Sequence, residues 1–143
     1  MQVLVADDDP VYRTLLDELF GEWGFDVVLA SDGQEAWEIL QGADPPKLLV
    51  LDWMMPRMDG FEVCKRIRSE TRSKNTYVLM MTGSRKKAEI MKVVVAGADD
   101  YLIKPFDPVD LKIHLRSAMR VISLQEELDG LVRVRHAEAS SSS

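Results

Sequence analysis

The sequence predicts an α/β fold: a doubly wound parallel sheet of five strands with five helices, the last of them extended. Short apolar runs alternate five times with stretches whose apolar residues recur every three or four positions. The run at 48–51 is apolar on both faces, as expected for a strand buried between two layers of helices. Turn residues separate the two kinds of segment, and this alternation favours parallel strands joined by right-handed crossovers.

The amino-acid composition argues against some classes of binding partner and indicates the compartment in which the protein works. Of the 143 residues, 46% are hydrophobic and 29% are charged, as in an ordinary globular protein. The net charge of −6 gives no general attraction to nucleic acid or to an anionic membrane, so neither is an expected partner of this domain. No apolar run approaches the roughly 20 residues that span a bilayer. With a single cysteine, Cys64, and no secretory leader, we expect a cytoplasmic protein without an internal disulfide, and we expect Cys64 to be buried.

The first half of the chain contains three expected strands, at 2–6, 25–29 and 48–51. Asp9 followed by Pro10 has the pattern of a helix start, and Gly24 ends that helix. Its inward face is expected to consist of residues four apart, widened by a neighbouring stripe: Val11, Leu15, Leu19 and Trp23, with Tyr12, Leu16 and Phe20. The second helix is expected at 34–41, with Ala36, Trp37 and Leu40 inward.

The second half continues the alternation, with helices at 60–70 and 86–96 and from 108 onward, and strands at 76–81 and 101–103. The helix at 86–96 has a strand as its alternative, because its three successive valines at 93–95 have poor helix propensity. We favour a helix because Gly97 suits a C-terminal cap. The expected inward residues are Val63, Cys64 and Ile67 on the third helix and Leu111, Leu115, Ala118 and Ile122 on the last.

Beyond the expected globular domain at 1–120, the helical pattern continues. Apolar residues at positions 121, 124, 128 and 131 are spaced three, four and three apart, which is the pattern of a coiled-coil seam. We therefore expect a helical extension or linker at 121–136 that pairs with its twin. A frayed overhang is the alternative, because the seam is short and contains Gly130. The serine-rich tail at 137–143 is expected to be disordered.

Polar side chains follow four of the predicted strands at the point where each strand ends. Asp7 and Asp8 follow the first strand, Asp52 the third, Thr82 the fourth and Lys104 the fifth. The carboxyl ends of parallel strands lie on one edge of the sheet, where ligands bind in open α/β folds. We therefore expect these residues to converge although they are scattered in the sequence.

Such a cluster suits a metal ion and a phosphoryl group. Two carboxylates about 4 Å apart repel by roughly 4 kcal/mol at an effective dielectric of about 20, so a third acid calls for a cation among them. Oxygen ligands without histidine or cysteine favour Mg²⁺. With Lys104 and Thr82 beside it, a phosphoryl group on Asp52, formed by nucleophilic attack, would fit. A single acid at a strand end is often only a helix cap, as expected for Asp9, so the prediction depends on all the strand ends together.

Four segments carry a family resemblance: the Asp7-Asp8 pair, LDWMMPRMDG at 51–60, MTG at 81–83 and GADDYLIKPF at 97–106. On these segments, residues 2–120 resemble a CheY-like receiver domain of a two-component response regulator. The resemblance implies the strand order 2-1-3-4-5. It also implies a signalling domain that catalyses its own phosphorylation and slow dephosphorylation, and that is not a conventional turnover enzyme.

The resemblance assigns the phosphoryl acceptor and the metal ligands. Asp52 corresponds to the acceptor, which takes its phosphoryl group from a phosphohistidine of a sensor histidine kinase or a phosphotransfer protein. Asp8 and Asp52 correspond to direct Mg²⁺ ligands and Asp7 to a ligand that acts through water. The backbone carbonyl of Met54 corresponds to the remaining protein ligand.

The resemblance also implies a switch. Thr82 and Lys104 correspond to the pair that senses the phosphoryl group, and a cis peptide bond between Lys104 and Pro105 orients the lysine. Tyr101 corresponds to an aromatic side chain that turns inward when Thr82 moves. The surface that switches is formed by the helix at 86–96, the fifth strand and the last helix.

Some positions depart from the family pattern. Gly83 stands where the family has a small side chain, which makes that loop more mobile. Ile90 and His114 replace residues that are basic in the winged-helix class of regulators, whereas Asp99 and Asp100 remain acidic. These differences count against the usual dimer and DNA-binding output of that class. A homodimer through the helices at 86–96 and from 108, together with the C-terminal extension, stays open.

Other functions fit less well or differ in output. A phosphatase of the haloacid dehalogenase type needs a second acid where this chain has Met54, and a flavodoxin-like carrier needs a glycine-rich loop where this chain has three acids at 7–9. A stand-alone receiver and a degenerate, phosphorylation-independent interaction module remain alternatives. LQEEL at 124–128 is similar to linkers that precede diguanylate cyclase domains, so that output is the first hypothesis for a larger regulator.

Overall fold

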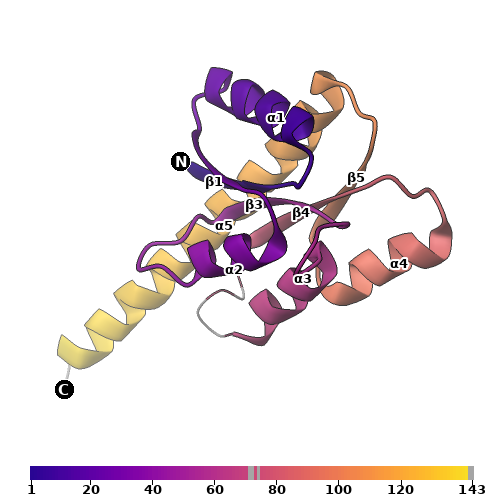
Figure 1. The fold of residues 1–143 in the computed structure, drawn as a ribbon. Helices are drawn as coiled ribbons and strands as arrows, with labels where there is room; N and C mark the ends of the chain where they lie inside the picture. The colour runs from indigo at the N-terminus through magenta and orange to yellow at the C-terminus, as the bar shows by residue number, and fades with distance from the viewer. Residues whose placement is uncertain (71–72, 74, 142–143) are drawn as a thin grey trace.

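The computed structural model describes residues 1–70, 73 and 75–141. Strands and helices alternate along the chain and form three layers (Figure 1). The strands are β1 (Gln2–Ala6), β2 (Asp26–Ala30), β3 (Leu48–Asp52), β4 (Tyr77–Thr82) and β5 (Asp100–Ile103). The helices are α1 (Pro10–Glu22), α2 (Gly33–Leu40), α3 (Gly60–Ser69), α4 (Lys87–Ala96) and α5 (Pro108–Ser141).

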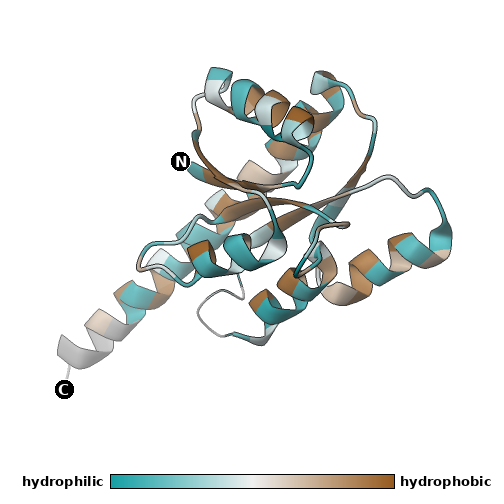
Figure 2. Ribbon diagram, viewed as in Figure 1, coloured by the Kyte–Doolittle hydropathy of each residue, from teal (hydrophilic) through white to brown (hydrophobic). Residues whose placement is uncertain are grey.

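The five strands form one parallel sheet in the order β2-β1-β3-β4-β5, so the predicted fold class and strand order are confirmed. β3 lies in the middle of the sheet and every one of its residues is buried. β2 lies at an edge of the sheet and is more exposed than β3. Brown apolar strands occupy the centre of Figure 2, and the teal polar residues lie mainly on the helices and loops.

Alternate side chains of each strand point to opposite faces of the sheet, so they pack into two separate cores, one on each face. On one face, α2, α3 and α4 cover the strands, and the predicted inward residues of α2 and α3 lie in this core, Trp37 only partly buried. On the other face, α1 and α5 cover the strands, with Leu111, Leu115, Ala118 and Ile122 of α5 buried as predicted. Cys64 is fully buried in the first core, as expected.

The inward face of α1 differs from the one we expected. Val11 is 73% exposed and Leu15 is 38% exposed, whereas Leu16 and Phe20 are fully buried. The sequence places two apolar stripes side by side on this helix, and the one that includes Leu16 and Phe20 is fully buried. Leu19 and Trp23 of the other stripe are only partly buried and pack against the same core. Phe20 is fixed there by edge-to-face contacts with Trp23 and Phe25.

Helix starts and stops follow the expected signals. The side chain of Asp9 accepts a hydrogen bond from the Val11 backbone N–H at 2.9 Å, which caps α1. The segment with three valines is helical, so the preference for a helix at α4 is confirmed. Gly97 ends α4 at a φ of +100°, in the left-handed region, where a side chain would be strained and would also meet Arg68.

α5 is the longest helix and leaves the globular domain. Its last core residue is Ile122, and from there it projects beyond the sheet, as the yellow end of the ribbon in Figure 1 shows. We expected disorder at 137–143, whereas α5 continues to Ser141, and the last two residues lie outside the described part of the chain. Among the described residues, no helix is both long enough and apolar enough to cross a membrane.

Candidate functional site

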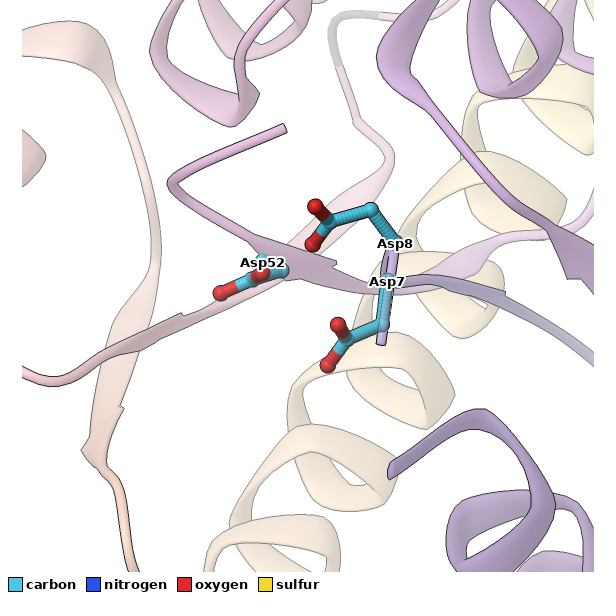
Figure 3. Close-up of side chains that lie close together, drawn as sticks. All are labelled: Asp7, Asp8 and Asp52. Atoms are coloured by element: carbon cyan, nitrogen blue, oxygen red, sulfur yellow. The ribbon is translucent and has the colours of Figure 1, made fainter. Parts of the chain in front are cut away.

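The acids at the ends of β1 and β3 converge at one edge of the sheet. Asp7 and Asp8 follow β1, and Asp52 is the last residue of β3, directly beside them (Figure 3). One carboxylate oxygen from each of the three lies within 4.8 Å of the others. Asp7 is fully buried and Asp52 is 8% exposed, whereas Asp8 is open to solvent. The cluster is therefore a pocket of negative charge with one open side.

Lys104, which follows β5, supplies the positive charge inside this pocket. Its Nζ lies 2.7 Å from Oδ2 of Asp7 and 3.4 Å from Oδ1 of Asp52. The same Nζ lies 4.0 Å from the centre of the Tyr12 ring, a cation–π contact from α1. The peptide bond between Lys104 and Pro105 is cis. The lysine is thus held between two carboxylates and an aromatic face.

Burial and like charge make Asp52 a weak acid. Burial, and then the charge of Asp7, raise the pKa of Asp52 from 3.8 to about 7, although Lys104 opposes the shift. For Lys104, burial acts to lower the pKa, but the hydrogen bond to Asp7 and the charge of Asp52 outweigh it, so the pKa is raised. Near neutral pH, without a metal ion, Asp52 is therefore divided between its protonated and ionised forms, while Lys104 stays charged.

Asp7 and Asp8 differ in what their carboxylates contact. Both oxygens of Asp7 are engaged, Oδ1 by the Asp9 backbone N–H at 2.9 Å and Oδ2 by Lys104. Asp8 has no such burial and lies on the open side of the cluster. Of this pair, Asp8 is consequently the acid with freer access to an incoming cation.

The loop between β3 and α3 is fixed close to Asp52. The Gly60 N–H donates to the Trp53 carbonyl at 2.8 Å, and the Trp53 N–H donates to the Met81 carbonyl at 2.9 Å. A Cβ on Gly60 would lie 2.3 Å from the Asp52 carbonyl oxygen, so only glycine allows this approach. Met54 lies in this loop, two residues after Asp52, with its side chain 72% exposed.

One contact of this loop, an ion pair with Asp32, was not foreseen from the sequence. Arg57 has a φ of +66° and places its Nε 3.2 Å from Oδ2 of Asp32. Asp32 is buried and also caps α2 by accepting from the Glu35 N–H at 2.8 Å. The distance of 25 residues between Asp32 and Arg57 left no local signal for the pair.

Thr82 and Tyr101 lie on neighbouring strands, on the same face of the sheet. Tyr101 pairs with Met80, two residues before Thr82, and strand side chains alternate between faces. Thr82 is 3% exposed, and its hydroxyl oxygen accepts a hydrogen bond from the Ser84 N–H at 3.1 Å. Tyr101 is half-buried and packs against the core that includes α4. The predicted sensing and switching side chains are therefore neighbours in space.

Tyr12 is the site residue that sequence reasoning did not find. We expected it only as part of the apolar face of α1. In the structure its ring lies against Lys104 and 5.9 Å from the ring of Phe106. The sequence did hold one signal for Tyr12: it lies in the first turn of a helix that begins beside the acids, at the edge of the sheet where ligands bind.

Comparisons with known proteins agree with this geometry. The chemotaxis protein CheY1 of Helicobacter pylori (strain ATCC 700392 / 26695) is 38% identical over 113 residues, which cover 78% of this chain and 91% of that protein. The probable transcriptional regulator ycf27 of Porphyridium aerugineum is 37% identical over 119 residues, 83% of this chain, and the chain spans about half (48%) of its length. The structure of Vibrio cholerae CheY4 has a TM-score of 0.74 at 32% identity, covering 84% of this chain and 97% of that one. A family model for the response regulator receiver domain matches residues 3–116, and the chain belongs to this family.

Proposed function

We propose that this receiver works by phosphorylation of Asp52, with the phosphoryl group supplied by a phosphohistidine of a sensor histidine kinase or a phosphotransfer protein. The observation that carries the proposal is the carboxylate of Asp52, placed beside two further acids and 3.4 Å from the ammonium of Lys104. An anionic nucleophile with a fixed cation beside it suits attack on a phosphoryl group. The domain is a signalling protein and not a conventional enzyme, and we place it in the cytoplasm.

The donor set of the acid cluster fits Mg²⁺. Three carboxylates with oxygens within 4.8 Å of one another supply hard oxygen ligands and an excess of negative charge. Asp8 and Asp52 would bind the ion directly, with the Met54 carbonyl. Asp7 would act through water, because both of its oxygens already accept hydrogen bonds. The ion would neutralise charge on the phosphoryl oxygens when bound.

The transfer step needs little beyond positioning. An oxygen of Asp52 forms a bond to phosphorus while the bond from phosphorus to the imidazole nitrogen of the donor breaks. The electron pair of that bond stays on the imidazole, which takes up a proton. Lys104 stabilises the phosphoryl oxygens as negative charge shifts, and Tyr12 keeps its Nζ on the inner side of the pocket. Asp52 must be ionised to attack, so a cation that lowers its raised pKa favours the reaction.

Phosphorylation would be read out by Thr82 and Tyr101. The Thr82 hydroxyl lies at the end of β4 and can turn from the Ser84 N–H toward a phosphoryl oxygen on Asp52. That movement would vacate space on the face of the sheet where Tyr101 packs, so Tyr101 and α4 would shift together. Amide hydrogen exchange should then change across residues 83–101. A change restricted to residues beside Asp52 would contradict the switch.

The main test is phosphorylation by a small donor. Incubated with acetyl phosphate, the chain should gain one phosphoryl group by intact mass, and only with Mg²⁺ present. Asp52→Asn should abolish the adduct, whereas Asp44→Asn, at an exposed acid of a distant loop, should leave it unchanged. An adduct that survives Asp52→Asn would refute the assignment. A protein that takes up nothing would instead be a degenerate receiver acting as an interaction module.

We further propose that the receiver controls an output through the end of α5. The similarity of residues 124–128 to linkers before diguanylate cyclase domains supports a cyclase, whereas the ycf27 relatives are named as transcriptional regulators. A stand-alone receiver that docks a partner, as in chemotaxis, is the alternative. Sequencing the complete reading frame distinguishes the three.

A further inference from the structure

α5 carries an exposed apolar stripe that begins beside its own domain, where Val121 lines a groove with Tyr77 of β4, and continues beyond the domain. Four apolar residues past Arg120 are between 49% and 63% exposed: Val121, Leu124, Leu128 and Leu131. Val132 and Val134, at 47% and 54%, widen the stripe. Single exposed apolar residues are ordinary, but a continuous row along a helix indicates a contact surface.

The opposite side of the same stretch of helix belongs to the domain. Ile122 is buried in the core, and Glu126 makes an ion pair with Lys47 at 2.8 Å. Gln125 and Asp129 line a groove of about 240 Å³ against the loop before β3. Ile122 and Glu126 fix which side of α5 faces the domain, and the residues of the apolar stripe remain about half exposed and open to contact by a second helix. The domain also holds the first turns of α5 in the helical conformation, so the extension only has to propagate an existing helix and needs no new nucleus.

The stripe has the heptad pattern of a two-stranded coil. The heptad places Val121 and Leu128 at positions a, and Leu124 and Leu131 at positions d. The seam therefore begins with a β-branched residue at a and leucine at d, which is the arrangement that favours parallel dimers. Gly130, which we had treated as an interruption, falls at position c, away from the seam. Arg135 occupies the next a position and ends the apolar stripe.

Charge favours the parallel direction. In an antiparallel pair that keeps the four apolar layers, Glu127 would lie opposite Glu127 of the partner subunit, a repulsive contact. A shift of that pair by one heptad toward the N-terminus would place Leu131 against His114, whose ring is bound to Asp100. A shift by one heptad in the other direction would place Leu124 against Arg135. In the parallel pair of residues 121–134, Arg120 faces a glutamine and Glu127 faces Val132. Like charges first meet at Arg135, where the apolar stripe has ended.

We propose that residues 121–134 form a parallel two-stranded coiled coil with a second copy of this chain. The 19 residues of α5 that follow Ile122 would extend about 28 Å from the domain. The two copies would then leave their domains side by side and point in the same direction. This surface is separate from the acid cluster, so the inference does not depend on phosphorylation.

Sedimentation equilibrium of the full chain at tens of micromolar tests the pairing. The wild type should be a dimer. Leu128→Glu should raise the dissociation constant of the dimer about tenfold or more, because it places two carboxylates in the seam. The matched control is Val109→Glu, since Val109 is 65% exposed on the same helix but outside the seam, and it should remain dimeric. Circular dichroism establishes that both variants are folded.

Cross-linking tests the direction. Leu128→Cys should form an intermolecular disulfide under mild oxidation, because equivalent a positions meet only in the parallel pair, and Ser123→Cys, on the outer face, should not. Native Cys64 is fully buried and stays out of the reaction. A wild-type monomer, or equal losses in Leu128→Glu and Val109→Glu, would overturn the proposal. A dimer that appears only with beryllofluoride and survives Leu128→Glu, or that Leu128→Cys fails to link, would overturn it as well.

Discussion

Replacing Asp52 by asparagine should stabilise the metal-free protein at neutral and alkaline pH. Asp52 has its pKa raised from 3.8 to about 7 by burial and by Asp7, with Lys104 in partial opposition. Between these two values the folded state binds more protons than the unfolded state, so stability falls as pH rises. The contribution of Asp52 is fully present below about pH 4 and is lost once pH exceeds about 7. Asparagine cannot ionise, so it escapes this loss.

The magnitude follows from the shift. About three pKa units correspond to roughly 4 kcal/mol at about 1.4 kcal/mol per unit, and the side chain is only 11% exposed, so solvent screening removes little of it. Two effects reduce this value. The repulsion between Asp7 and Asp52 belongs to both carboxylates, and the neutral asparagine loses the ionic contact with Lys104. We therefore expect Asp52→Asn to raise the free energy of unfolding by about 2–4 kcal/mol at pH 8. At pH 4.5 only the first part of the loss has occurred, so the gain should fall to about 1 kcal/mol or less.

Urea unfolding in EDTA, followed by circular dichroism, measures both values. Asp44→Asn is the control, because Asp44 is an exposed loop acid, and its effect should stay within about 0.5 kcal/mol at both pH values. Addition of Mg²⁺ should stabilise the wild type more than Asp52→Asn and reduce the difference between them. If Asp52→Asn changed stability by the same amount at pH 4.5 and pH 8, burial and charge at Asp52 would not be the cause.

Three further predictions concern the surroundings of Asp52. Asp8→Ala should weaken Mg²⁺ binding, measured by calorimetry, more than Asp7→Ala does, and equal losses would contradict direct and water-mediated roles. Tyr12→Leu should slow phosphorylation by acetyl phosphate about threefold to tenfold, the range expected for one cation–π contact, whereas Tyr12→Phe should keep most of the rate; equal slowing by both would exclude the ring face as the cause. Gly60→Ala should cost more than about 2 kcal/mol of unfolding free energy in urea, because its Cβ would overlap the Asp52 carbonyl, whereas Gly83→Ala, with open space around it, should cost less than about 0.5 kcal/mol.

The convergence at the site could be predicted because it needs only the order of strands and the place where each ends. Parallel strands must bring their carboxyl ends to one edge, so the residues at the ends of β3 and β4 and those just after β1 and β5 had to meet. The local signals at helix ends were equally reliable, since Asp9 and Gly97 act through their own backbone neighbours.

Features that depend on which surfaces pack against one another could not be predicted from the sequence. α1 carries two adjacent apolar stripes, and only contact with the sheet selects Leu16 and Phe20 over Val11 and Leu15. The contacts that raise the pKa of Asp52 and hold Lys104 over Tyr12 join three segments that are far apart in the chain, at 7–12, 52 and 104. A periodic pattern fixes what lies on one face of an element, because that depends on local geometry. The partner of that face, and the electrostatics that result, are set by packing between elements far apart in the chain.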